Sequence, residues 1–98
     1  MVITWREEKR LLNLRKHGLD FALAEKVVSD PLAITVFDRV QDGEERWHTI
    51  GAIWSGTSFK VVVVVHTYPE HGDETWIHVI SLRAAEPRER RRYEISHL

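Results

Sequence analysis

Cysteine is absent from this 98-residue sequence, proline occurs three times, and no apolar run is long enough to form a membrane span. Without cysteine, the chain has no disulfide framework, no thiolate zinc site and no cysteine nucleophile. The start of the chain, Met1 to Trp5, leads directly into charged residues and lacks the apolar core of a signal peptide. These absences favour a cytoplasmic protein that makes no membrane contact.

Neither sign of charge is in excess, because 14 Lys and Arg residues stand against 15 Asp and Glu residues. The formal net charge of −1 excludes nucleic-acid binding by bulk charge alone and leaves room for a local basic patch. Apolar residues make up 43% of the chain, which is enough material for one buried core. We expect residues 1–98 to form a single domain.

The first thirty residues predict two helices. Thr4 and Glu7 fit a capping box that opens the first helix, which continues through Lys16 and stops at Gly18. Asp20 is a cap for a second, shorter helix, which ends at Asp-Pro because proline disfavours a helical residue before it. The apolar residues of that second helix are Phe21, Ala24, Val27 and Val28.

The middle of the chain predicts four strands, followed by a helix that Glu86 and Pro87 open. The expected strands cover residues 32–37, 46–54, 58–68 and 75–82, with a charged turn at 38–45. Five consecutive valines indicate a strand covered on both faces, and short loops favour an antiparallel meander. The sequence predicts an α+β fold in the order α-α-β-β-β-β-α, with a four-stranded antiparallel sheet packed by helices on one face.

The first helix carries a polar ridge that ends where the helix stops. Lys9, Asn13, Lys16 and His17 recur at helical spacings of three or four. One interpretation is a solvated face. The other is a functional surface, because an imidazole at the helix end can exchange protons near neutrality.

The fourth strand and the last helix carry further polar candidates. His78 lies within that strand and fits either a proton-transfer role or a half-buried ring tied to the backbone. Arg83 fits either a two-pronged phosphate contact or an ion pair with Glu86 or Glu89. The last helix adds a basic run with a tyrosine that can stack on a base or orient a phosphate. This run consists of Arg88, Arg90, Arg91, Arg92 and Tyr93.

The chemistry of these residues suits metal-free RNA cleavage. His66, His71 and Asp73 do not meet ordinary zinc or calcium spacing, so we expect no metal and no other cofactor. In metal-free cleavage the 2′-hydroxyl attacks the adjacent phosphate, a base removes its proton, cations stabilise the added charge and an acid protonates the leaving oxygen.

Short strings along nearly the whole chain resemble the BrnT toxins of type II toxin–antitoxin pairs. Their order and spacing make the resemblance specific. They are Ile3-Thr4-Trp5, Lys9, Asn13, Lys16-His17-Gly18, Phe21, Ala24, Val27, Ser29-Asp30-Pro31-Leu32, Glu45-Arg46, Thr49-Ile50-Gly51, Val64-Val65-His66-Thr67-Tyr68, Ile80-Ser81, Arg83 and Glu89 to Tyr93.

The resemblance implies a RelE-like fold and an endoribonuclease that inhibits translation. It also implies a neutralising BrnA-like antitoxin that binds operator DNA, so that this chain reaches DNA only through its partner. Two alternatives keep other roles open: a catalytically degenerate toxin acting as a binding or co-repressor subunit, and a small regulatory domain that binds a protein.

The active-toxin hypothesis assigns catalysis to His17, Arg46, Arg83 and Tyr93. Its second-rank catalytic or RNA-binding residues are Lys9, Lys16, His66, His78, Arg88 and Arg91. The chain departs from the family's pattern at three positions where cations are common, which here hold Pro69, His78 and Ala84. His78 is a candidate to replace a lost cation as acid or base.

Overall fold

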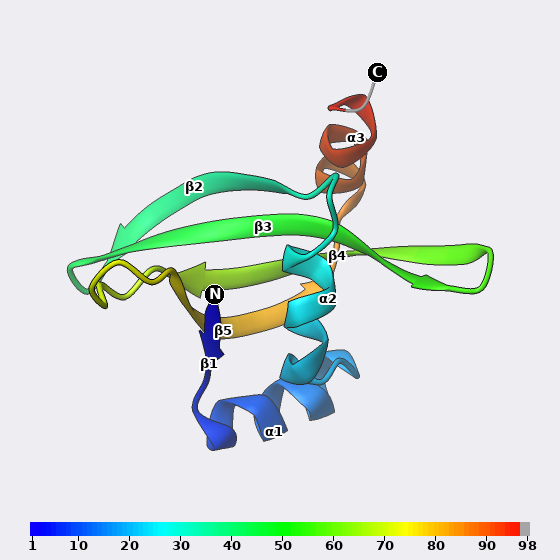
Figure 1. Ribbon diagram of the computed structural model, residues 1–98. Coiled ribbons are helices and arrows are strands. Elements are labelled where there is room, and N and C mark those ends of the chain that lie inside the picture. Colours follow the sequence, from blue (N-terminus) through cyan, green and yellow to red (C-terminus); the bar gives the residue numbers. More distant parts are fainter. Residues whose placement is uncertain (97–98) are drawn as a thin grey trace.

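A computed structural model describes residues 1–96 and shows a five-stranded sheet with three α-helices (Figure 1). The strand order is β1-β5-β4-β3-β2, and all neighbours are antiparallel except β1 and β5. The α+β prediction is confirmed, but the sheet has five strands and is mixed. The strands are β1 (Val2–Thr4), β2 (Ile34–Gln41), β3 (Glu44–Ser55), β4 (Ser58–Thr67) and β5 (Trp76–Ala84); the helices are α1 (Glu7–His17), the 3-10 turn η1 (Phe21–Leu23), α2 (Ala24–Val28) and α3 (Pro87–Ile95).

The fifth strand is the N-terminal segment, which we expected to cap a helix. Val2–Thr4 pairs in parallel with β5, and the Thr4 hydroxyl shares a hydrogen bond of 2.9 Å with Nδ1 of His78. The N-cap of α1 is therefore Arg6, whose side chain makes no capping bond. The predicted Thr4–Glu7 capping box is wrong because Thr4 is held in the sheet.

The end of α1 and the start of η1 agree with the predictions from the sequence. Gly18 ends α1 in the left-handed conformation at φ 70°, and the Asp20 carboxylate accepts from the Ala22 N–H at 3.0 Å.

The charged turn predicted at 38–45 is shorter in the structure. Because Asp42 and Gly43 both take positive φ, a two-residue turn suffices and β2 and β3 extend on either side of it.

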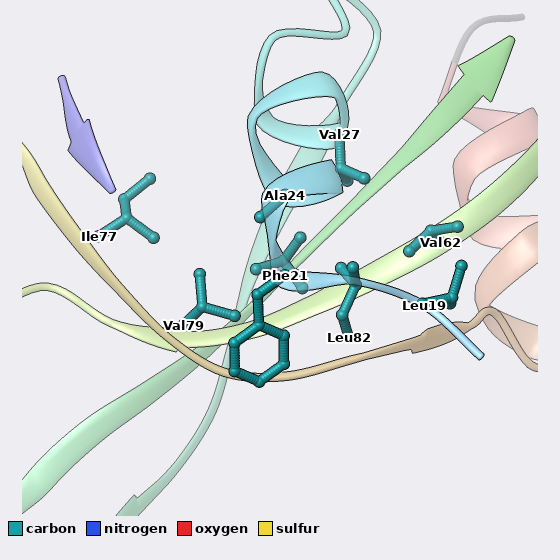
Figure 2. Close-up of a cluster of buried hydrophobic side chains, with 9 residues drawn as sticks. Leu19, Phe21, Ala24, Val27, Val62, Ile77, Val79 and Leu82 are labelled. Atoms are coloured by element: carbon teal, nitrogen blue, oxygen red, sulfur yellow. The ribbon is translucent and has the colours of Figure 1, made fainter. Parts of the chain in front are cut away.

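One face of the sheet, which we call the α2 face, is covered by η1 and α2 (Figure 2). Gly51 lets the helix approach closely, because a Cβ there would lie 2.6 Å from the Val27 carbonyl oxygen. The buried side chains are those of Leu19, Phe21, Ala24, Val27, Val62, Val64, Ile77, Val79 and Leu82.

The opposite face, which we call the α3 face, is partly covered by α3. Tyr93 packs there with Ile50, Val61 and Val63, which alternate with the valines of the α2 face. The expectation that helices cover one face only is therefore wrong. The valine run is buried on both faces, as predicted.

A β-bulge explains why Ile77, Val79 and Leu82 share a face although their spacing is not strictly alternating. Val65 pairs with Ser81 and the next residue of β4 pairs with Val79, so β5 carries one extra residue. This extra residue shifts the alternation of β5.

Asn13 of α1 completes the edge of β5 beyond the end of β1. Its Nδ2 donates to the carbonyl oxygens of Leu82 at 2.8 Å and Leu19 at 3.0 Å, and its Oδ1 accepts from the Leu82 N–H at 3.1 Å. The Ser81 hydroxyl donates to the same oxygen at 3.2 Å. Asn13 is buried, so the predicted solvated or functional ridge does not include it.

No helix within residues 1–96 is long and apolar enough to cross a membrane.

Replacing Asn13 with Ala should lower the free energy of unfolding by about 2–3 kcal/mol, because the buried N–H of Leu82 then has no partner. Urea unfolding followed by tryptophan fluorescence measures this change. Lys16→Ala, at an exposed position of the same helix, should change stability by less than about 0.5 kcal/mol. Equal losses in the two variants would show that the edge contact contributes nothing.

Candidate active site

Four charged or titratable side chains meet on the α3 face near the start of α3. We call them the charge cluster: Asp38 from the bulge of β2, His48 from β3, Arg83 from the end of β5 and Glu89 from α3. They come from four separate elements, and their side chains are each between 17% and 31% exposed. The cluster is therefore partly desolvated and still reachable from solvent.

Glu89 is the centre of the charge cluster. Its two carboxylate oxygens accept from the two terminal nitrogens of Arg83 at 2.7 and 2.9 Å. One of these oxygens also accepts from the Glu86 N–H at 2.9 Å, which completes a capping box at the start of α3. One carboxylate thus fixes both the arginine and the helix end. Of the two pairings expected for Arg83, the one with Glu89 is present.

His48 lies between two carboxylates. Its Nε2 is 3.5 Å from an oxygen of Asp38, and its Nδ1 is 3.8 Å from an oxygen of Glu89. A protonated imidazole would form an ion pair on each side.

Electrostatics within the cluster favour the charged forms of Arg83 and Glu89. Hydrogen bonding to the Arg83 guanidinium lowers the pKa of Glu89, and burial only partly offsets that effect. The same hydrogen bonds raise the pKa of Arg83. Both groups are therefore ionised throughout the neutral range.

Arg46 lies two residues before His48 on β3 and so faces the same side of the sheet. The Nε of Arg46 is buried and has no hydrogen-bond partner among residues 1–96. Arg83 already binds a carboxylate, whereas the Arg46 guanidinium makes no ion pair within these residues. A planar guanidinium of this kind is suited to bind a phosphate.

Tyr93 is buried, at 5% exposure, and its hydroxyl donates to the Asp30 carboxylate at 2.5 Å. The same carboxylate accepts from the Ala52 N–H at 2.8 Å and the Leu32 N–H at 2.9 Å. Burial and the neighbouring carboxylate raise the pKa of the Tyr93 phenol. This burial argues against the stacking on RNA that the sequence suggested, and it makes Tyr93 a residue that positions α3.

The other predicted residues form no hydrogen bond or ion pair with the charge cluster within residues 1–96. Lys9 and Lys16 are exposed on α1, and His17 at the end of that helix is half-buried and makes no hydrogen bond or ion pair within residues 1–96. α1 packs against β5, and Asn13, one turn before His17, bonds to the residue that precedes Arg83. Within residues 1–96, no hydrogen bond or ion pair joins His17 to Arg83.

Two predicted histidines are engaged in structural contacts. His66 is fully buried on the α2 side, shares a hydrogen bond of 2.8 Å with the Thr49 hydroxyl, and has a pKa lowered by burial. Its burial argues against contact with RNA. His78 is half-buried and bound to Thr4 rather than to the backbone.

The basic run of α3 remains solvent-facing. Arg88 and Arg91 are exposed, as are the other two arginines of the helix, and none of the four forms an ion pair within the described chain. Residues 1–96 contain no group of three or more His, Cys, Asp or Glu side chains placed to hold a metal ion.

Sequence reasoning missed His48 and Asp38 and treated Glu89 only as a neighbour of Arg83. The available signal was the spacing of Arg46 and His48, because residues two apart on a strand share a face. Asp38 was assigned to a turn, and only the pairing of β2 with β3 reveals that it is a bulge residue beside His48.

Comparison with known families identifies the family of this chain. A family described as the ribonuclease toxin BrnT of type II toxin–antitoxin systems matches residues 5–89. The chain belongs to the BrnT family. The resemblance drawn from the sequence is thereby confirmed, and with it the class of ribonuclease toxins of type II toxin–antitoxin systems. No curated protein matches the chain.

Glu89→Gln should lower the free energy of unfolding by about 2 kcal/mol at pH 7, because glutamine keeps the capping acceptor but not the charge that Arg83 requires. The lowered pKa of Glu89 means that its contribution is complete above the ordinary Glu range and is lost as the pH falls through the lowered value.

Urea unfolding at a series of pH values tests this expectation. The stability difference between wild type and Glu89→Gln should shrink as the pH falls below about 4. Glu94→Gln, on an exposed position of the same helix, is the matched control. A difference that stayed constant down to pH 2 would contradict a charge-dependent role for Glu89.

Proposed function

We propose that this chain is a metal-independent endoribonuclease whose RNA site is the open part of the α3 face beside the charge cluster. The observation that carries the proposal is the Arg46 guanidinium, which lies on this face with a buried Nε and no partner among residues 1–96. RNA offers the phosphate oxygens that such a group binds. Membership of a ribonuclease toxin family supports RNA as the substrate.

Arg46 is the primary phosphate contact in this proposal, and Arg83 is the second. Both would stabilise the negative charge that accumulates on phosphorus when the 2′-hydroxyl attacks. Because Arg83 already binds Glu89, it would present its remaining donor capacity from a fixed position. A guanidinium held in advance loses little entropy when the substrate binds.

The exposed arginines of α3 extend the proposed RNA surface beyond the cleavage site. Arg88 and Arg91 lie on the same helix as Glu89, so a strand of RNA that passes the charge cluster can continue along them. Lys9, Lys16 and His17 form a separate basic region on α1. We assign that region to RNA binding away from the cleaved bond.

The partner in this proposal is a BrnA-like antitoxin, which would neutralise the toxin by covering the Arg46 and Arg83 side chains. Translation would stop when messenger RNA is cut, and operator DNA would be bound through the antitoxin.

The alternative function is that of a degenerate toxin that serves as a co-repressor subunit. The departures at Pro69, His78 and Ala84 favour it, because cations that are common in the family are missing there.

Arg46→Ala should reduce RNA cleavage about 100-fold, because it removes a charged donor to the reacting phosphate. The assay uses purified protein, a defined messenger RNA and EDTA, with the reaction products tested for 2′,3′-cyclic phosphate ends. Arg15→Ala removes an exposed arginine of α1 and should leave the rate within about threefold of wild type.

Two results would overturn parts of this proposal. Equal rates for wild type and Arg46→Ala would remove Arg46 from the site. A wild-type protein that cleaves no RNA, with or without translating ribosomes, and that does not arrest growth when expressed alone would favour the degenerate toxin.

A further inference from the structure

His48 is the member of the charge cluster that can transfer a proton near neutrality, and the proposed phosphate contacts do not use it. Its ring stands two residues from Arg46 on the same face of β3, so a phosphate held by Arg46 lies next to the imidazole. The side chain is 19% exposed. It is therefore sheltered from bulk water without being sealed in the core.

We propose that His48 is the general acid of the RNA cleavage reaction, held ready by Asp38 and Glu89. The inference rests on the proposed endoribonuclease function and names the residue that protonates the leaving oxygen. Its Nε2 lies 3.5 Å from an oxygen of Asp38 and its Nδ1 lies 3.8 Å from an oxygen of Glu89, so the two carboxylates fix the orientation of a ring that can carry a proton to the substrate.

His48 acts in the step in which the 2′-oxygen displaces the 5′-oxygen from phosphorus. The 2′-oxygen forms a bond to phosphorus, and the bond between phosphorus and the 5′-oxygen breaks with its electron pair going to that oxygen. The proton on Nε2 of His48 passes to the 5′-oxygen, and the proton of the 2′-hydroxyl passes to a solvent water molecule. The products are a 2′,3′-cyclic phosphate and a free 5′-hydroxyl, with His48 left neutral.

Both ring nitrogens of His48 face a carboxylate, and the Asp38 oxygen that faces the ring also lies 3.4 Å from Nε of Arg39. From β2 the ring faces Asp38, and from α3 it faces Glu89. Glu89 is already paired with Arg83, so part of its charge is neutralised. Both contacts are longer than a normal hydrogen bond, which leaves the N–H groups able to turn to a substrate oxygen.

The remaining histidines of the described chain are less suited to this role. His66 is fully buried, and His78 is bound to Thr4. The ring of His71 stacks on Trp76 at a centroid distance of 3.9 Å in the β4–β5 connection. His17, at the end of α1, forms no hydrogen bond or ion pair with the charge cluster among the described residues.

A pair of RNA substrates tests the proposal directly. Both contain the site at which the wild-type protein cuts, one with the natural 5′-oxygen at the cleaved bond and one with sulfur in its place. A thiolate leaves without being protonated, so cleavage of the sulfur substrate needs no general acid. Rates are measured for wild type, His48→Gln and Arg46→Ala under single-turnover conditions.

We expect His48→Gln to be at least about 100-fold slower than wild type on the oxygen substrate and within about threefold of it on the sulfur substrate. Arg46→Ala should be slow on both, because the phosphate charge must be stabilised in either case. His48→Asn, checked with His48→Gln by thermal melting and circular dichroism, replaces it if that variant does not fold.

Three outcomes overturn the inference. An unchanged rate on the oxygen substrate removes His48 from the reaction, and an equal loss on both substrates makes it a positioning residue rather than an acid. In both cases cleavage by the wild-type protein leaves the proposed function standing. If the wild-type protein cleaves neither substrate, the endoribonuclease function fails, and the role of His48 fails with it.

Discussion

The sheet depends on one constraint: its two outer strands are shorter than the strands they cover, and buried backbone groups must still find partners. Beyond the end of β1, the side chain of Asn13 takes up the N–H and C=O of Leu82. Beyond the pairing of Ile34 with Ile50 at the other edge, the Asp30 carboxylate accepts from the Ala52 N–H. A polar side chain within α1 and another just after α2 thus replace missing strand residues and fix both helices to the sheet.

A polar side chain also fixes the position of α3 on the sheet. Because the Asp30 carboxylate also accepts the Tyr93 hydroxyl, the sheet edge and the last helix are joined through one side chain. A second contact between α3 and the sheet lies near the start of the helix, where Glu89 binds Arg83 and completes the helix cap. The helix is held at two points four residues apart, and the charge cluster is built on the second of them. A site on elements fixed in this way keeps its geometry when a substrate arrives.

Local signals in the sequence predicted the end of α1, the start of η1 and the buried apolar positions of η1 and α2, but not the start of α1. Gly18, Asp20 and the apolar residues of η1 and α2 act within a few residues of chain, where capping and periodicity are informative. β1 could not be predicted in this way, because a three-residue strand has no period and its partner lies more than 70 residues away. The candidate site was predicted only in part for a related reason. Arg83 was predicted from its type and position and Arg46 from the family resemblance, whereas the position of Asp38 beside His48 depends on a bulge that only the pairing of two strands creates.

The bulge at Asp38 also shows how an edge strand can serve two purposes. A bulge interrupts the regular row of backbone donors and acceptors, which makes an exposed edge a poorer template for another chain. Here it also turns a carboxylate onto the face where Nε2 of His48 lies 3.5 Å away. Asp38 is the only member of the cluster on an edge strand, and Glu89, on the opposite side of the ring, belongs to a capped helix. The imidazole therefore lies between an edge strand of the sheet and a capped helix end, and each of these elements contributes one carboxylate beside the ring.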